Sequence, residues 1–195
     1  MRWPYMTFLI IIALGLAALQ EFICQVSINK TKDGSGLIEF FLPQDVSTTA
    51  YFCWKYLGTM VLVTYGVLWQ IADFEVKRLE PYYQLSTRGG AKAGNSLNLD
   101  YLTFMAYLIP LRALRRKQWA VVFSSVATLL AGGLLPVLQS ASVNMTPKHS
   151  SKDNKKFVRI HPVWSRVLTG SLVLVAILGI SLAVSLRRRS GLLSE

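Results

Sequence analysis

The chain has 195 residues, of which 52% are apolar and only 16% are charged, and its net charge is +11. Soluble domains usually carry about 25% charged residues, so the shortage of charge is the informative feature, and disorder and collagen are excluded. Two Cys and two His exclude a disulfide-rich scaffold and a four-ligand zinc site. The basic residues lie in islands between apolar runs, so nucleic acid is not an expected partner.

Four charge-poor runs have about the 20 residues that a helix needs to cross a bilayer. They predict an all-α integral membrane protein with four transmembrane helices, at about residues 5–24, 52–73, 119–140 and 166–186. Trp and Tyr residues lie near the ends of these runs, as expected where aromatic rings prefer the headgroup layer. The chain, residues 1–195, is expected to form a single membrane domain.

The first run also resembles a secretory signal peptide, because it follows Arg2 and contains the small residues Gly15 and Ala17. It continues to Cys24, which is longer than a typical signal core, so an uncleaved anchor is the favoured interpretation. Both alternatives place the chain from residue 25 onward outside the cytosol.

The loops on that outer side contain two Asn-x-Thr patterns, at Asn29 and Asn144, which are candidate N-glycosylation acceptors. Cys24 and Cys53 are both expected near the outer membrane face. In an oxidising lumen they could form a disulfide closing a loop of about 30 residues, worth about 3–4 kcal/mol on the loop-entropy model. Two free thiols that behave as small hydrophobes are the favoured alternative.

The orientation follows from the basic residues, which resist translocation across the membrane. More of the 21 Lys and Arg residues fall on one side when both termini and the segment 73–118 are cytosolic. Lys77 and Arg78, the cluster Arg112–Lys117 and the cluster Arg187–Arg189 all lie at membrane exits. The prediction is a multi-pass protein of the secretory pathway or plasma membrane with cytosolic termini and one larger cytosolic loop.

The cytosolic segment starts as a continuation of the second span. Asp73 and Lys77 have the i,i+4 spacing of a helical ion pair, and Pro81 is expected to end this helix. The charge-free run Tyr101–Leu111 is too short to cross a bilayer. It is expected to lie in the membrane interface or to fold over neighbouring helices.

This segment contains the motif Lys77, Arg78, Leu79, Glu80, Pro81 and Tyr82. The motif is followed by Gln84–Ser86 and, further along, by Arg115 and Arg116 ahead of Trp119. Together these features look like the repeat of an uncharacterised fungal multi-pass membrane family, a domain of unknown function, over about residues 50–143. The resemblance implies a fungal membrane protein and supplies no activity.

No residue pattern indicates catalysis, a cofactor or a metal. The Gly-rich turn at residues 89–94 lacks the Gly-Lys-Ser/Thr ending of a phosphate-binding loop. His149 and His161 have no paired metal-ligand spacing and are expected on the surface. The carboxylates of Asp73, Glu75 and Glu80 could form an acid/base cluster, but each has a basic neighbour at helical spacing, which favours ion pairs on a helical stalk.

Transport is the alternative class, since buried ionisable groups usually mark membrane pathways. Gly132, Gly133 and Pro136 interrupt the third span and could line a cavity, although a kink in a packed helix is the favoured interpretation. Small residues four apart indicate close helix packing within the chain or in a homo- or hetero-oligomer. These pairs are Ala127 with Ala131 and Gly179 with Ala183.

The expected function is therefore a non-enzymatic structural or interaction component of the membrane, with a subunit of a transport or channel assembly as the alternative. The basic residues beside the interfacial run could contact anionic lipid. The favoured alternative is that these residues only set the topology. The candidate lipid contacts are Arg112, Arg115, Arg116, Lys117, Arg187, Arg188 and Arg189.

Overall fold

The computed structural model describes residues 3–32, 38–40, 52, 56–86, 101, 105–147 and 156–191. The helices are α1 (Trp3–Lys32), α3 (Gly58–Ser86), α4 (Ile109–Arg115), α5 (Trp119–Leu129), α6 (Leu135–Ser142) and α7 (Pro162–Gly191). A π-helical turn, η3 (Leu130–Leu134), joins α5 to α6. The strands are β1 (Ile38–Phe40), β2 (Val143–Pro147) and β3 (Lys156–Ile160).

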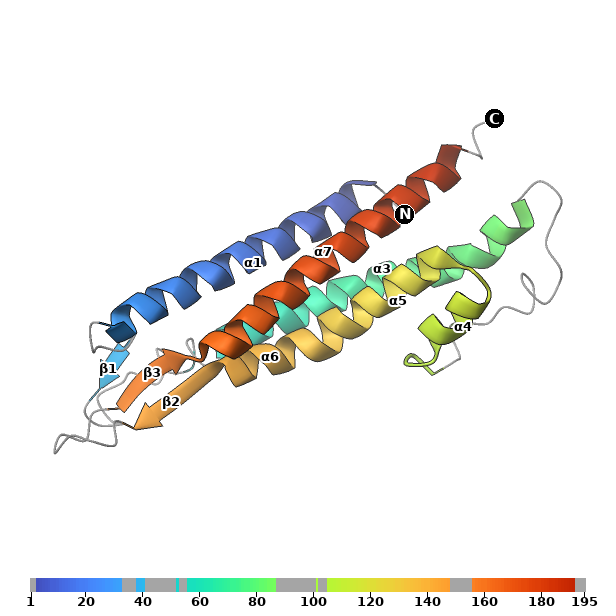
Figure 1. Cartoon of the computed structure of the whole chain (residues 1–195). Coiled ribbons are helices and arrows are strands. Elements are labelled where there is room, and N and C mark those ends of the chain that lie inside the picture. Colours follow the sequence, from blue (N-terminus) through green and yellow to red (C-terminus); the bar gives the residue numbers. More distant parts are fainter. Residues whose placement is uncertain are drawn as a thin grey trace.

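The long helices run side by side as a bundle (Figure 1). α1 packs along α7, and α3 packs along the continuous rod formed by α5, η3 and α6. α7 links the two pairs through its contacts with α5 and α6. The strands lie at one end of the bundle, whereas both chain ends point toward the other end (Figure 1).

Three segments are long and apolar enough to cross a membrane: Pro4–Lys30, Trp119–Ser142 and Pro162–Arg187. Helices suit such segments because a backbone in lipid must satisfy its N–H and C=O groups internally. The helical class is confirmed, and three of the four predicted spans coincide with segments of this kind. The predicted span at 52–73 overlaps α3, which is not among the three and carries several charges in its second half.

Two predicted helix ends are wrong. Pro81 does not end α3, which continues to Ser86. A proline costs one backbone hydrogen bond, but the turn around it is held by the buried side chain of Glu80, which accepts a hydrogen bond from Gln84 Nε2 at 2.9 Å. α1 likewise continues to Lys32, so Asn29 is part of a helix rather than of a loop.

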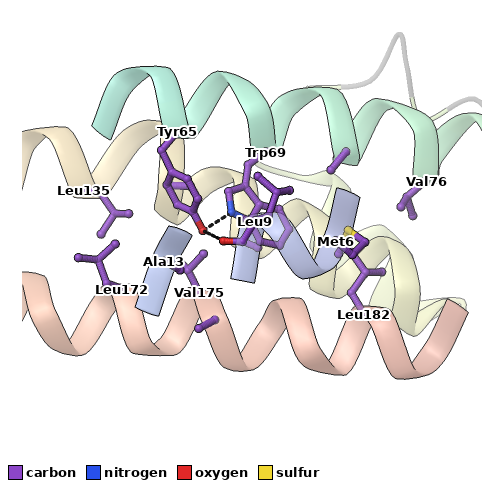
Figure 2. Packing of buried hydrophobic residues seen from close by; sticks show 14 of the residues in the cluster. Met6, Leu9, Ala13, Tyr65, Trp69, Val76, Leu135, Leu172, Val175 and Leu182 are labelled. Carbon is purple, nitrogen blue, oxygen red and sulfur yellow. Dashed lines mark hydrogen bonds between the residues drawn. The ribbon is translucent and has the colours of Figure 1, made fainter. Parts of the chain in front are cut away.

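The core between the helices combines large and small side chains (Figure 2). Trp69 of α3 is fully buried, and its indole Nε1 donates to Tyr65 Oη at 2.6 Å. Tyr65 Oη in turn donates to the carbonyl oxygen of Leu9 in α1 at 3.4 Å. Leu172 and Val175 of α7 pack on the same cluster. The aromatic pair therefore fills the bundle and satisfies its own polar atoms, as buried Tyr and Trp require.

The π turn follows from Pro136. A proline has no N–H, and in a regular α-helix its ring would clash with the carbonyl four residues back, at Gly132. The chain widens here: the N–H of Leu135 bonds to the carbonyl of Leu130, five residues earlier. Such insertions into α-helices recur at functional sites.

A small antiparallel sheet with strand order β1-β3-β2 closes one end of the bundle, and the sequence analysis did not predict it. Val158 of β3 pairs with Ile38 of β1 on one side and with Met145 of β2 on the other. The N–H of His161 donates to the carbonyl of Ser142 at 2.9 Å, which ties the start of α7 to the end of α6. The segments predicted as outer loops therefore contain paired strands.

Candidate functional site

A buried polar cluster lies between α3 and α5. Asp73 is 6% exposed, and its Oδ2 forms an i,i+4 ion pair with Lys77. Its Oδ1 accepts hydrogen bonds from Ser124 Oγ at 2.8 Å and from Ser125 Oγ at 3.2 Å. We call these four residues the polar cluster. The predicted ion pair is confirmed, but it lies inside the bundle and not on an exposed stalk.

Helical spacing explains why these charges face inward. Asp73, Lys77 and Glu80 follow Tyr65 and Trp69 along the buried stripe of α3, at the three- and four-residue steps that repeat one helix face. A single buried carboxylate would be costly. Here one ammonium group and two hydroxyls surround the carboxylate, so most of the hydrogen-bonding capacity of Asp73 is used.

A second polar group lies next to the cluster, toward the end of α3. Tyr101 is 2% exposed, and its hydroxyl donates to the side-chain carbonyl of Gln118, the residue that precedes α5. Burial raises the pKa of Tyr101 above its ordinary value of 10.0, with Glu80 adding to the rise, and the nearby Arg116 and Arg112 partly oppose it. The phenol therefore stays protonated and keeps its role as a donor.

An open cleft of about 480 Å³ leads from the surface to the polar cluster. Its floor includes Asp73 and Lys77, and one wall is the π turn, through Gly132 and Gly133. The expectation that these glycines serve mainly as a packed kink was therefore incomplete, because they also line a cavity. The remaining lining residues are Gln70, Phe74, Tyr101, Ala106, Tyr107, Ile109, Thr128 and Leu129.

Two side chains of the cleft, Lys77 and Gln70, carry N–H donors. Lys77 has three N–H donors, and within the described part of the chain its hydrogen bond is to Asp73 alone. The amide of Gln70 is exposed and has no hydrogen bond among those residues. Thr128 Oγ1 already donates to the carbonyl of Trp69 at 3.3 Å. The cleft can therefore offer N–H donors to an acceptor-rich group.

α4 lies beside the cleft as a short amphipathic helix. Ile109 and Ala113 are buried against the bundle, whereas Leu111 is 58% exposed. The helix ends in a Schellman turn, in which the N–H of Gln118 bonds to the carbonyl of Ala113 and the N–H of Lys117 to that of Leu114, each at 3.0 Å. Lys117 adopts a φ of 58° there, a position that usually takes glycine.

The other predicted site residues are not brought to this cleft. Asn29 is exposed near the end of α1, and Asn144 lies in β2 at the same end of the bundle. Cys24 is buried, whereas Cys53 lies outside the described residues, so their pairing stays a prediction. Arg115 and Lys117 are exposed, and Arg112 and Arg116 are half-buried. No group of metal-ligating side chains occurs among the residues that the structure describes, and His149 lies outside them.

Several residues of this site were not predicted from the sequence. Ser124 and Ser125 form an adjacent polar pair inside the third apolar run, and Gln70 is an amide inside the second. Polar side chains in a membrane span usually hydrogen-bond across helices. That signal was available, but the partner of each residue depends on how α3 and α5 pack.

Residues 52–144 match a family model described as a protein of unknown function (DUF3433). No curated protein and no solved structure matches the chain. The resemblance to a domain of unknown function is thereby confirmed at that level. The matched region contains α3, α4, α5, η3 and α6, so it includes the whole polar cluster and every residue that lines the cleft.

Proposed function

We propose that the chain spans the membrane four times, with α3 crossing in addition to the three apolar segments, and with both termini in the cytosol. α3 supports this arrangement because it lies against the rod of α5, η3 and α6: a Cβ added at Gly58 would meet the side chain of Gln139 in α6. The strand end of the bundle, with Asn29 and Asn144, is then the outer side. The end with α4 is the cytosolic side.

The chain acts as a non-enzymatic interaction component of a fungal membrane, in the secretory pathway or the plasma membrane. It contacts anionic lipid at the cytosolic surface. The exposed apolar and basic side chains at α4 carry this proposal. Leu108, Leu111 and Leu114 are 48%, 58% and 49% exposed, and the exposed Arg115 and Lys117 adjoin them. An apolar surface flanked by cations is typical of a helix in the interface of an anionic membrane.

The test compares the lipid shell of the full chain in vesicles that contain equal amounts of phosphatidylglycerol and phosphatidylcholine. The native protein is expected to enrich phosphatidylglycerol around itself, at about 1 kcal/mol per cation near the surface. Arg115→Gln combined with Lys117→Gln should lower that enrichment. Lys30→Gln combined with Arg166→Gln is the control, because both residues are exposed at the strand end. Equal effects of the two pairs would contradict the proposal.

Participation in a transport or channel assembly is the second candidate, and one observation favours it. The ion pair of Asp73 and Lys77 lies at the floor of a cleft whose wall is a π turn containing Gly132 and Gly133. Buried ionisable groups beside interrupted helices are typical of solute pathways in membranes. Solute or proton flux in vesicles that contain the chain, lost in Asp73→Asn, would support transport over the lipid-contact role.

Exposed apolar side chains along the bundle are compatible with lipid on one face and with a homo- or hetero-oligomer on another. Gly179 does not supply an oligomer face, because a Cβ there would lie 3.1 Å from Ile10 Cγ1 of α1. Ala127 and Ala131 are also fully buried within the chain. We propose that an oligomer contact, if present, uses exposed residues such as Ile11 on α1.

A further inference from the structure

We propose that the cleft beside the polar cluster binds a single anionic phospholipid taken from the surrounding bilayer. Its headgroup phosphate accepts hydrogen bonds from Lys77 and Gln70, and its acyl chains leave along Phe74 and Tyr107. The inference rests on the proposed placement of the chain in a membrane, but it does not depend on the exposed cations of α4.

The hydrogen-bonding inventory of the cleft selects an acceptor-rich ligand. Three donors occupy most of the roughly four acceptor sites of Asp73, so it has little capacity left for a cationic ligand. Lys77 retains N–H donors that Asp73 does not use, and Gln70 adds two more from its amide. A phosphate group supplies several acceptor oxygens and forms strong charge-assisted hydrogen bonds to Lys.

The charges around the cleft select an anionic headgroup over a zwitterionic one. Asp73 and Lys77 cancel each other, and Glu80 offsets one cation near Tyr101. Arg112 and Arg116 both act electrostatically on Tyr101, which lines the cleft. These two guanidinium groups add positive potential on the side of the cleft formed by Tyr101. They attract a phosphodiester and disfavour the quaternary ammonium of a choline headgroup beside it.

The apolar part of the cleft fits a lipid rather than a small water-soluble anion. Phe74 is 49% exposed and Tyr107 is 79% exposed, although both line the cleft. Met105, which is 73% exposed, lies two residues before Tyr107. Large exposed apolar side chains that lead into a polar cleft match an amphiphile, with the headgroup inside and the chains in the bilayer.

Two variants test the cleft without disturbing the ion pair. Gly133 lines the cleft, and a Cβ built there has no atom within 4 Å, so Gly133→Phe starts its side chain in open space at the cleft. Gln70→Leu removes the amide donor from an exposed position. Gly170→Phe is the matched control, because Gly170 on α7 also has open space around its Cβ and does not line the cleft.

The experiment reconstitutes the full chain in vesicles with equal phosphatidylglycerol and phosphatidylcholine of the same acyl chains, extracts it in mild detergent and counts retained lipids by native mass spectrometry. The native chain and Gly170→Phe should each retain one phosphatidylglycerol. Gln70→Leu should reduce retention about tenfold or more, the effect expected from loss of a hydrogen bond to a charged group. Gly133→Phe should reduce retention at least as much, because the ring occupies the space of the headgroup. Circular dichroism establishes that each variant is folded.

Three results would overturn the inference: equal retention of the two lipids by the native chain, undiminished retention in folded Gly133→Phe, or displacement of the lipid by millimolar inorganic phosphate, which would identify a soluble anion as the ligand. Arg115→Gln with Lys117→Gln separates this inference from the proposed function. That pair should lower enrichment in the lipid shell and leave the retained lipid in place.

Discussion

Gly66 marks the closest approach between two helices of the bundle. A Cβ at this residue of α3 would lie 2.8 Å from the Cα of Gly132 and 2.9 Å from the carbonyl oxygen of Ala131. Both neighbours are backbone atoms of the π turn, so they cannot rotate away as a side chain could. The absence of a side chain at Gly66 therefore sets the distance between α3 and the wall of the cleft.

At this scale we expect Gly66→Ala to lower the free energy of unfolding by about 1–3 kcal/mol, the usual cost of overpacking a tight contact. Gly15→Ala is the matched control, because it is also a helical glycine but has nothing within 4 Å. That change should leave stability equal or raise it by about 1 kcal/mol through helix propensity. Thermal unfolding in mild detergent measures both, and equal melting temperatures would disprove the close contact.

At the scale of elements, the polar cluster fastens α3 to α5. Ser124 and Ser125 both donate to the carboxylate of Asp73, so two hydrogen bonds to one charge cross between the helices. Tyr101 and Gln118 add a further link beside them. Much of the surrounding contact is apolar and non-directional, whereas these bonds specify how α3 is rotated and shifted along α5.

We expect Ser124→Ala combined with Ser125→Ala to destabilise the protein by about 2–4 kcal/mol, because Asp73 would lose two donors while staying buried. The control is Ser140→Ala combined with Ser181→Ala, whose hydroxyls donate to carbonyls of their own helices. Unfolding by a denaturing detergent, followed by circular dichroism, gives the comparison. An effect no larger than that of the control would show that the cluster does not hold the helices together.

At the scale of the whole molecule, the bundle has two chemically different ends. One end has the sheet and the two candidate glycosylation acceptors, and the other has α4, the polar cluster and the cleft. The N-terminal end of α1 and the C-terminal end of α7 lie toward the second end (Figure 1). Two termini at one end require an even number of crossings, and in the proposed arrangement α3 adds the fourth to the three helices that are apolar enough to cross.

Topology mapping checks that arrangement in the full chain. With Asn29 and Asn144 changed to Gln, a glycosylation reporter placed at residue 95, 150 or 195 should be modified at residue 150 alone. The reason is that segments beside basic clusters stay in the cytosol. Modification at residue 95 would place α4 and the mouth of the cleft on the outer side and would invert the proposed orientation.

The sequence by itself determined the helical class, three helices long and apolar enough to cross a membrane, the ion pair of Asp73 with Lys77 and the short apolar run that leads into α4. These features depend on hydropathy and charge spacing along a local stretch of chain, which a linear pattern records. Predictions about boundaries were weaker, since Pro81 was expected to end a helix that burial of Glu80 carries on to Ser86.

Tertiary structure alone decided the site. Ser124 and Asp73 are 51 residues apart, and nothing local to either residue specifies that they meet. Their contact depends on the rotation and axial shift of two helices, which the close approach at Gly66 and the widened turn ahead of Pro136 set together. Because of this packing, Gly132 and Gly133, which were predicted mainly to kink a helix, form a wall of the cleft. The ion pair of Asp73 with Lys77, which was predicted on a stalk, lies at the floor of the cleft.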